Sequence, residues 1–473
     1  MGYLALNSAF NLKPKHCFVF IAVLLFSAPV AAQNLNLGSL GYSQLQETTS
    51  VSVRDTCVGF VRNGSNGALE QDLFEACGSM VNTENSLLNN PANARLDRRI
   101  SADELASGFQ NIATEETLSP LRIGTNAASG VSLAVLGRVQ ALRGGGASGY
   151  GLNNPRSNGS QIALFPGSAL SGGGAGDAEN PVAGQLSGFV NTFGGIGDTS
   201  QTSRTNASDF YNIGFTAGVD YRVLDNLVLG LAGGYSHVDL DFKRQLNVAG
   251  GSVESDTGGL SAYGTYYVGG FYMDGLFSYG WSDFDIDRQI FINSNNPGVP
   301  VINRTATANT DGSQWTLSFQ TGYDFNTGAL SYGPYVKFNY LSVQTDKYTE
   351  QGAGGLNLVI NEQQAESMQS VVGAQISYSM SQSFGVLVPY LRFQWQHEFR
   401  DPSRSLVARY LNDPRNNLLV ATSDSPDTDY FNLNTGISTV LQNGLQAYFN
   451  YNALLGNDLI SGHLFTVGVR QEF

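Results

Sequence analysis

From residue 184 to the C-terminus, apolar and polar side chains alternate with a period of two along most of the chain. In the last stretch, 463–473, Phe465 and Val467 fall on one face, while Thr466 and Arg470 fall on the other. A strand with one apolar and one small or polar face suits a sheet that separates two unlike media. Similar runs stand at 211–222, 315–325, 387–399 and 445–452. Taken together, such runs predict about twelve strands.

The connections between these runs alternate between short and long. Tight turns are expected at 224–226, 269–270, 327–329, 381–383 and 442–444. Long polar loops are expected at 194–208, 244–252, 290–304, 346–363, 401–427 and 456–460. Short periplasmic turns and long outer loops are typical of transmembrane barrels, whereas a soluble sandwich gives no reason for loop length to alternate. We therefore predict an all-β transmembrane antiparallel barrel over residues 184–473, closed by its first and last strands.

A different pattern precedes the barrel. Apolar residues at three-and-four spacing predict a helix over 57–88, while 33–53 shows no clear period. Ser101 and Glu104 form a capping-box pattern that begins a second helix, and a further helical run ends in the glycines 144–146. Residues 144–183 form a Gly/Ser/Asn/Pro-rich linker that cannot bury a core. The segment 33–143 is thus expected to be short and mostly α-helical.

The N-terminus has the pattern of a secretory signal peptide. Lys13 and Lys15 precede an apolar run over 17–28, and small residues at 30–32 provide a cleavage site before Gln33. Removal of residues 1–32 leaves two cysteines, Cys57 and Cys77. In an oxidising compartment an isolated pair is expected to form a disulfide, worth about 3 kcal/mol in the chain-entropy model.

Composition supports a barrel and limits the classes of partner. The 473 residues include 56 Gly, 22 Tyr and 27 Phe, and only 14% are charged. Only alternate residues of a barrel strand meet lipid, so no long apolar run is needed. The formal net charge of −14 argues against nucleic acid as a partner, because no basic stripe is available to neutralise phosphates.

Candidate catalytic chemistry is sparse. Apart from His16 in the signal peptide, the histidines lie on three different predicted strands: His237, His397 and His463. Each is in phase with outward-facing neighbours, which favours a lipid-facing role over catalysis, and the sequence has no G-x-S-x-G elbow. The spacing of Asp283, Asp285 and Asp287 puts three carboxylates on one face, where they could bind Ca²⁺ or form a hydrated acidic rim. We favour the rim, and expect no metal and no cofactor.

Several charged residues fall on predicted inward faces: Asp220, Asp324, Lys337, Arg392, Glu398 and Arg470. Buried charges need partners, so these residues are expected to form a hydrated lumen network that grips a plug. Arg138 and Arg143, on the last predicted helix, are candidate partners, and our hypothesis is that Arg138 lies in the pore.

Two stretches resemble a known family. The segment Val388–Phe399, with its Pro, Trp and His-Glu-Phe, resembles a strand of the translocator barrels of autotransporters. The stretch 101–143 is similar to the helical region before such barrels, and the terminal Phe473 resembles the signal that outer-membrane barrels present to their assembly machinery.

The resemblance implies a barrel in the bacterial outer membrane, with surface-exposed loops and a helix in its lumen, that anchors, and could also export, its own short N-terminal segment at the cell surface. It also implies contacts with outer-membrane lipid and lipopolysaccharide, with the barrel assembly machinery and with periplasmic chaperones. We expect a monomer without enzymatic activity. A porin-like channel plugged by N-terminal helices and an outer-membrane hydrolase remain as alternatives. The segment 33–143 could lie at the surface, in the lumen or in the periplasm, and the linker rather than the helix could thread the pore.

Overall fold

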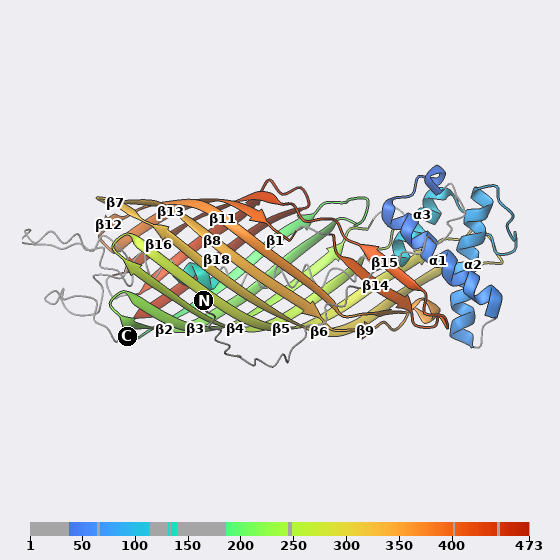
Figure 1. The fold of residues 1–473 in the computed structure, drawn as a ribbon, viewed down its shortest axis with the longest axis horizontal. Helices are drawn as coiled ribbons and strands as arrows, with labels where there is room; N and C mark the ends of the chain where they lie inside the picture. Colours follow the sequence, from blue (N-terminus) through green and yellow to red (C-terminus); the bar gives the residue numbers. More distant parts are fainter. Residues whose placement is uncertain are drawn as a thin grey trace, which may run out of the picture.

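A single antiparallel sheet closes on itself in the computed structural model (Figure 1), which describes residues 37–63, 67–113, 131, 134–139, 186–244, 248–400, 403–441 and 445–472. The sheet has 14 strands, of which two, β7 (Phe325–Thr327) and β12 (Met380–Gln382), only lengthen hairpins at their turns. The remaining twelve form the wall: β1 (Leu186–Thr199), β2 (Ser208–Leu224), β3 (Leu227–Phe242), β4 (Gly251–Val268), β5 (Phe271–Ile292), β6 (Ile302–Tyr323), β8 (Leu330–Thr345), β11 (Gln363–Tyr378), β13 (Gly385–Glu398), β16 (Asp429–Leu441), β17 (Gln446–Leu455) and β18 (Ile460–Glu472). The predicted number of strands is confirmed.

The barrel closes where its first strand meets its last. β1 pairs with β18 in an antiparallel register that places Val190 opposite Val469, and β8 pairs with β11 on the far side. Every wall strand therefore has two neighbours, and the wall has no exposed edge. The predicted closure is confirmed.

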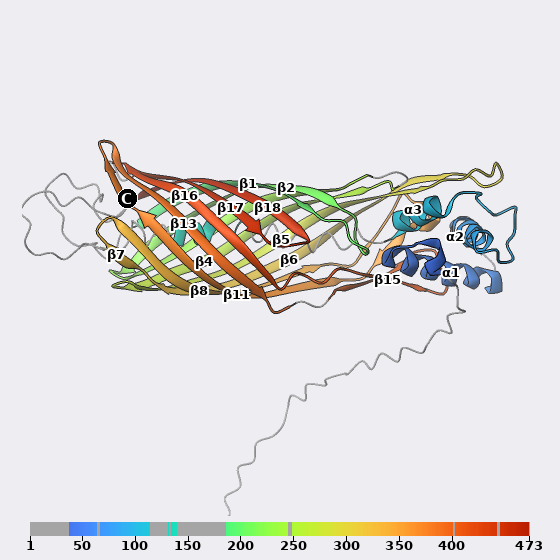
Figure 2. The ribbon, with the colours of Figure 1, turned by 90° about the horizontal axis from the view of Figure 1, so that it is seen from above.

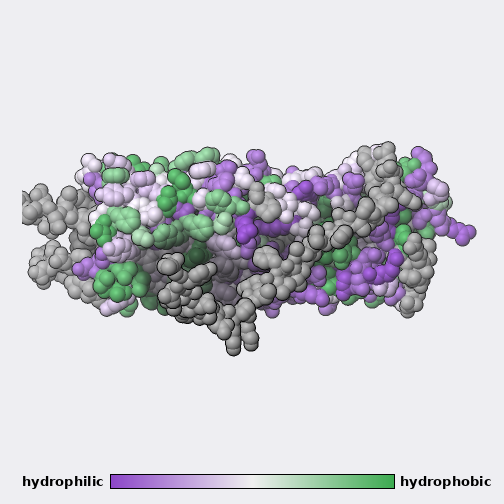
Figure 3. All heavy atoms as spheres, in the orientation of Figure 1, coloured by the Kyte–Doolittle hydropathy of each residue, from purple (hydrophilic) through white to green (hydrophobic). Residues whose placement is uncertain are grey.

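In the half that carries the short turns, the outer face of the wall is apolar and the inner face carries polar groups among aromatic and aliphatic ones, as β5 illustrates. Phe277, Tyr279 and Trp281 are exposed on the outer face, whereas Asp274 and Ser282 are buried on the inner face. The outward aromatic stretch from residue 271 to 281 has the length that a tilted strand needs to cross a membrane. In the face shown in Figure 3, hydrophilic residues become more frequent toward the end that carries the helices.

Beyond Trp281 the apolar and polar faces of the same strand are exchanged. Its outward positions become acidic, as at Asp283 and Asp285, and its inward positions become apolar, as at Phe284 and Ile286. The strands therefore extend past the membrane and form part of a water-exposed domain with its own core. The expected long loop at 290–304 is correspondingly short, because β5 continues to Ile292 and β6 begins at Ile302.

Two of the predicted long loops contain regular structure that the sequence reading missed. Strands β9 (Tyr348–Thr349) and β10 (Leu358–Ile360), with the 3-10 helix η4 (Gly354–Leu356), lie within 346–363. Strands β14 (Ser405–Tyr410) and β15 (Leu418–Thr422) lie within 401–427. They form a separate four-stranded sheet in the order β15-β14-β10-β9. These strands are too short for their alternation to be distinguished from loop sequence.

The described residues within 37–113 form three helices and a short 3-10 helix: η1 (Leu37–Leu40), α1 (Gln44–Asn63), α2 (Ala68–Leu87) and α3 (Ala102–Ile112). The helix predicted over 57–88 is not continuous, because Gly67 has an extended backbone and is the N-cap of α2; the predicted range is divided between α1 and α2. α1 also begins at Gln44, well before the predicted start at 57. The first part of this helix was not predicted because it contains few apolar residues. The capping box at Ser101 and Glu104 is confirmed. None of the described helices has the length and apolar composition of a membrane-crossing helix.

The described residues within 37–113, with helices α1–α3, which we call the cap, lie at the long-loop end of the barrel, opposite the turns at β7 and β12 (Figures 1 and 2). One continuous apolar core joins the cap to the extended strands and to the second sheet. It includes Leu73, Met80 and Phe109 of the cap together with Ile292 and Leu406. Cap and rim therefore fold as one hydrophobic unit.

Inward-facing aromatic rings of the wall pack closely against glycines of the neighbouring strands. The Phe189 ring of β1 lies over Gly218 of β2, and the Tyr448 ring of β17 lies over Gly468 of β18. A Cβ at either glycine would collide with the ring. Glycine at these positions thus permits close approach of aromatic side chains to the neighbouring strand.

A disulfide ties α1 to α2. Cys57 and Cys77 are bonded, with Cα atoms 5.8 Å apart, and both are buried in the cap core. The predicted pairing is confirmed. Residues 1–36, with the expected signal peptide, and the expected linker 144–183 lie outside the described residues.

Replacing both cysteines with alanine is expected to destabilise the cap by about 3 kcal/mol, because the bond closes a loop across a separation of 20 residues. The urea midpoint for proteolysis within residues 37–113 should fall, while the heat-modifiable gel mobility of the barrel should not change. An unchanged midpoint would contradict this prediction.

Candidate functional site in the lumen and at the rim

A short helix lies inside the barrel. Residues 134–139, which we call the lumen helix, present Val135, Leu136 and Val139 to inward-facing rings and aliphatic side chains of the wall. The wall side of this contact consists of Phe189, Val228, Ala232, Tyr263, Tyr267, Tyr272, Leu276 and Tyr335. At the N-terminal end of the described helix, Asn191 donates to the Ala134 carbonyl at 3.1 Å. Packing and hydrogen bonds thus hold the helix against β1, β3, β4 and β5 and near Tyr335 of β8.

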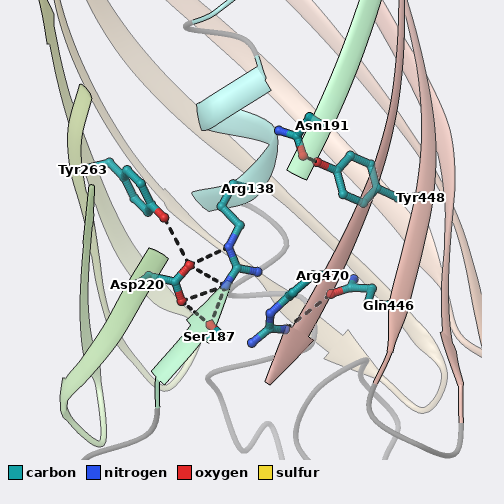
Figure 4. Close-up of polar contacts among 8 residues, drawn as sticks. All are labelled: Arg138, Ser187, Asn191, Asp220, Tyr263, Gln446, Tyr448 and Arg470. Carbon is teal, nitrogen blue, oxygen red and sulfur yellow. Dashed lines mark hydrogen bonds and ion pairs between the residues drawn. The ribbon is translucent and has the colours of Figure 1, made fainter. Parts of the chain in front are cut away.

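Arg138 makes the central polar contact of the lumen helix (Figure 4). Its Nε and Nη2 atoms donate to the two Asp220 carboxylate oxygens, each at 2.7 Å, and Nη2 also reaches Ser187 Oγ at 2.9 Å. Asp220 accepts two further bonds, from Ser187 Oγ at 2.5 Å and from the Tyr263 hydroxyl at 3.1 Å. The Arg138 guanidinium stands 5.5 Å from the Phe189 ring centre.

This ion pair is fully enclosed, because the two side chains are only 1% and 2% exposed. The fork geometry of the guanidinium matches the carboxylate, so the pair fixes both the position and the rotation of the lumen helix. Arg138 therefore lies where the pore hypothesis puts it. Arg143 lies outside the described residues, as does Phe473.

The other predicted lumen charges make local contacts with different partners among the described residues. Asp324 accepts from Gln375, and Glu398 accepts from Ser367, from the Met368 backbone and from Gln369. Arg470 donates to Gln446 at 3.3 Å (Figure 4), and Arg392 stands 5.7 Å from the Tyr390 ring centre. No hydrogen bond or ion pair between described residues joins Asp220, Asp324, Lys337, Arg392 and Glu398 to each other. The single network expected from the sequence is thus replaced by separate local contacts on different strands.

At the long-loop end, Arg98 anchors the cap to the tip of the β5–β6 hairpin. Its Nη1 atom donates to the carbonyls of Asn293 at 3.1 Å, Pro300 at 3.2 Å and Ile292 at 3.4 Å. Its Nε atom donates to Ser79 Oγ at 2.9 Å. Burial lowers the pKa of Arg98 to about 10, so the guanidinium stays protonated at neutral pH. Nothing in the sequence pattern pointed to this residue.

Asp72 of α2 makes a second anchor. Its carboxylate accepts from both terminal nitrogens of Arg304 on β6, at 2.5 and 2.7 Å, and from the Gly355 backbone at 2.8 Å. The hydrogen bonds from Arg304 lower the pKa of the Asp72 carboxyl below its usual value. The anchor therefore links the cap to the wall and to η4 together.

Cap docking is expected to weaken in acid because of Asp72. A carboxyl with a depressed folded pKa stabilises above its unfolded pKa of about 4, and this contribution is lost as pH falls through the folded pKa. Both partners are partly exposed, so the effect is about 1 kcal/mol at most. Protease protection of the cap should therefore drop below pH 4, and the drop should be smaller in Asp72→Asn. An identical pH profile in the variant would exclude Asp72 as the cause.

The outer face beyond the aromatic belt carries the acidic residues and the three histidines. His237 contacts Asp256 and His397 contacts Asp429, each at 3.0 Å, while His463 contacts the Tyr451 hydroxyl at 2.8 Å. The described residues contain no group of three or more His, Cys, Asp or Glu side chains placed to hold a metal ion. The acidic side chains Asp283, Asp285 and Asp287 lie on the exposed outer face of β5.

The barrel sequence matches one protein family. Residues 188–452 match the autotransporter β-domain, a match that covers more than half of the chain. The chain belongs to the autotransporter β-domain family. Its barrel is accordingly an outer-membrane translocator domain that anchors the chain in that membrane.

Individual autotransporters and other proteins are similar over part of the chain. Esterase EstA of Pseudomonas aeruginosa is 25% identical over 287 residues, which cover 58% of this chain and 41% of EstA. Lipase 1 of Photorhabdus luminescens is 24% identical over 264 residues, 54% of this chain and 38% of that protein. The solved translocator domain of the autotransporter NalP from Neisseria meningitidis has a TM-score of 0.48 and 15% identity, and the match covers 61% of this chain and 88% of the NalP domain. This chain thus spans well under half the length of EstA and Lipase 1.

Proposed function

We propose that this autotransporter exports residues 37–113 through its own barrel and keeps them at the cell surface as a docked cap. The supporting observation is the course of the chain. The cap lies at the long-loop end, the lumen helix lies inside the wall, and β1 begins opposite Tyr221, near the short β2–β3 turn. The described part of the connection between cap and β1, residues 134–139, therefore lies in the lumen between an end at the long loops and an end at the short turns. Because short turns face the periplasm, the cap is on the outside.

Retention rather than release follows from the docking contacts. A released passenger needs a surface that is complete without the barrel, whereas this cap shares its core with strands of the rim. Arg98 and Asp72 add polar anchors at two separate places. We therefore propose display of a fixed cap, with lipopolysaccharide as the lateral neighbour of the acidic outer face.

A non-catalytic role is part of this proposal, although two relatives are named as an esterase and a lipase. A serine hydrolase needs a histidine within hydrogen-bond reach of its nucleophile. In the part of the chain that the structure describes, each histidine contacts an Asp or Tyr side chain rather than a serine hydroxyl. This arrangement favours a structural role for the cap.

The test is the accessibility of an epitope inserted between α1 and α2 on intact cells. Antibody and protease should reach it, as they should reach a control epitope in the β17–β18 loop (456–459). A second control epitope at Gly269–Gly270 should be protected until the membrane is permeabilised. Heat-modifiable mobility confirms that each barrel is folded. Protection of the α1–α2 epitope on intact cells would refute surface display.

A further inference from the structure

The lumen helix occupies only one side of the barrel. On its other side a cavity of about 140 Å³ remains between Leu136 and the inward faces of β8, β13, β16, β17 and β18. A water molecule needs roughly 10–15 Å³ by this measure, so the cavity holds several waters or a small hydrated ion. The cavity lies between the barrel wall and the lumen helix, so its existence does not depend on whether the cap is displayed at the cell surface.

Lys337 of β8 points into this cavity and is 9% exposed. Its ammonium has no hydrogen-bond or ion-pair partner among the described residues. In the same inward row, Lys337 is paired in register with Gln320, which donates to Asp274 at 3.4 Å. Asp274 is already bonded to Thr265 Oγ1 at 2.7 Å. Asp274 thus accepts from Thr265 and Gln320, and no hydrogen bond or ion pair between the described residues joins it to Lys337.

Arg392 of β13 lines the same cavity, with its guanidinium stacked on Tyr390. Among the described residues, no ion pair or hydrogen bond to its guanidinium is formed. The wall of this cavity contains these two cations and no carboxylate; its other polar groups are hydroxyls and side-chain amides, among them Gln394, Asn434 and Asn450. Lys337 and Gln394 also line the adjoining larger cavity, of about 440 Å³, where the carboxylates Glu398, Asp424 and Asp427 lie farther along the lumen. The cavity is thus lined by positive charge and by neutral groups that can donate hydrogen bonds.

On the opposite side of the lumen helix, a buried cation is neutralised by a carboxylate. There Arg138 is matched by Asp220, and the carboxylate is further satisfied by Ser187 and Tyr263. Lys337 is buried without such a partner, and an unpaired buried charge is strongly unfavourable. We propose that the cavity beside the lumen helix binds one small oxyanion between Lys337 and Arg392, with a guanidinium fork and an ammonium as its charged ligands.

Inorganic phosphate is the probe for this site. The full-length protein is refolded in radiolabelled phosphate at constant ionic strength, freed of excess phosphate and assayed for retained label, so that a closed lumen cannot prevent access. The wild-type protein should retain about one phosphate per folded barrel. Lys337→Met and Arg392→Met should each reduce binding at least tenfold. Lys347→Met, at an exposed loop position, is the matched control and should bind like the wild type.

A second readout separates loss of the site from loss of the fold. Phosphate should raise the temperature at which the wild-type folded gel band disappears, and this shift should vanish in Lys337→Met although its barrel folds. Acetate that displaces phosphate would assign the site to oxyanions in general. Wild-type protein that retains no phosphate, or a Lys337→Met variant that retains as much as wild type, would overturn the proposal. In either case surface display of the cap would be unaffected.

Discussion

Arg138→Glu is expected to release the lumen helix and open the barrel to ions. The substitution removes the enclosed bidentate pair and places a second carboxylate against Asp220. Breaking a buried pair by removing one partner destabilises by about 3–5 kcal/mol, which shifts the equilibrium between bound and released helix by more than about a hundredfold. Apolar packing of Val135 and Val139 remains, but it cannot offset two facing carboxylates in an enclosed site.

Single-channel recording in planar bilayers measures this effect. The time-averaged conductance of the variant should exceed that of the wild type at least tenfold. Arg415→Glu, the same substitution at an exposed loop position, should leave the conductance unchanged. The charge-swapped double variant Arg138→Glu/Asp220→Arg should recover part of the closure. Equal conductance of the wild type and Arg138→Glu would show that Arg138 does not hold the plug.

Arg98→Met is expected to detach the cap while the barrel stays intact. The methionine retains an apolar stem but none of the four donated hydrogen bonds, so the carbonyls of Ile292, Asn293 and Pro300 lose their shared donor. Hydrogen bonds to charged groups contribute about 1.5–3 kcal/mol each, and they are not additive at one side chain, so we expect a total loss of about 3 kcal/mol.

Hydrogen exchange of the cap amides measures this loss. Exchange in α2 and α3 should accelerate more than about tenfold, since 1.4 kcal/mol corresponds to a factor of ten in an opening equilibrium. Exchange in β2 and β3 should stay as in the wild type. Arg99→Met provides the control, because Arg99 is the adjacent residue but is exposed. Slow exchange in the Arg98 variant would mean that the apolar core alone holds the cap.

The barrel could be predicted from the sequence because the same alternating pattern is repeated in strand after strand. A period of two with alternating loop lengths is a constraint that twelve strands satisfy together, so errors at single positions do not change the result. Arg138 could also be placed, since an arginine on an apolar helix requires an acidic partner and Asp220 falls on an inward face.

The cap could not be placed in the same way, although one signal was available. The phase of β5 continues past Trp281, but there the inward positions Phe284 and Ile286 are apolar and the outward ones acidic. Apolar side chains directed into the end of a barrel require a cover, and the segment 37–113 supplies it. Arg98 left no such signal, because its partners are backbone carbonyls, which any sequence provides.

The shared core has a consequence for cargo exchange. Autotransporter barrels could be used as vehicles by replacing the native N-terminal segment with a foreign protein. Here that replacement would leave Phe284, Ile292 and Leu406 uncovered at the rim, in contact with water. Exposed apolar patches of this kind promote aggregation and misassembly. A foreign cargo would therefore have to be fused ahead of residues 37–113, with the native cap retained beneath it.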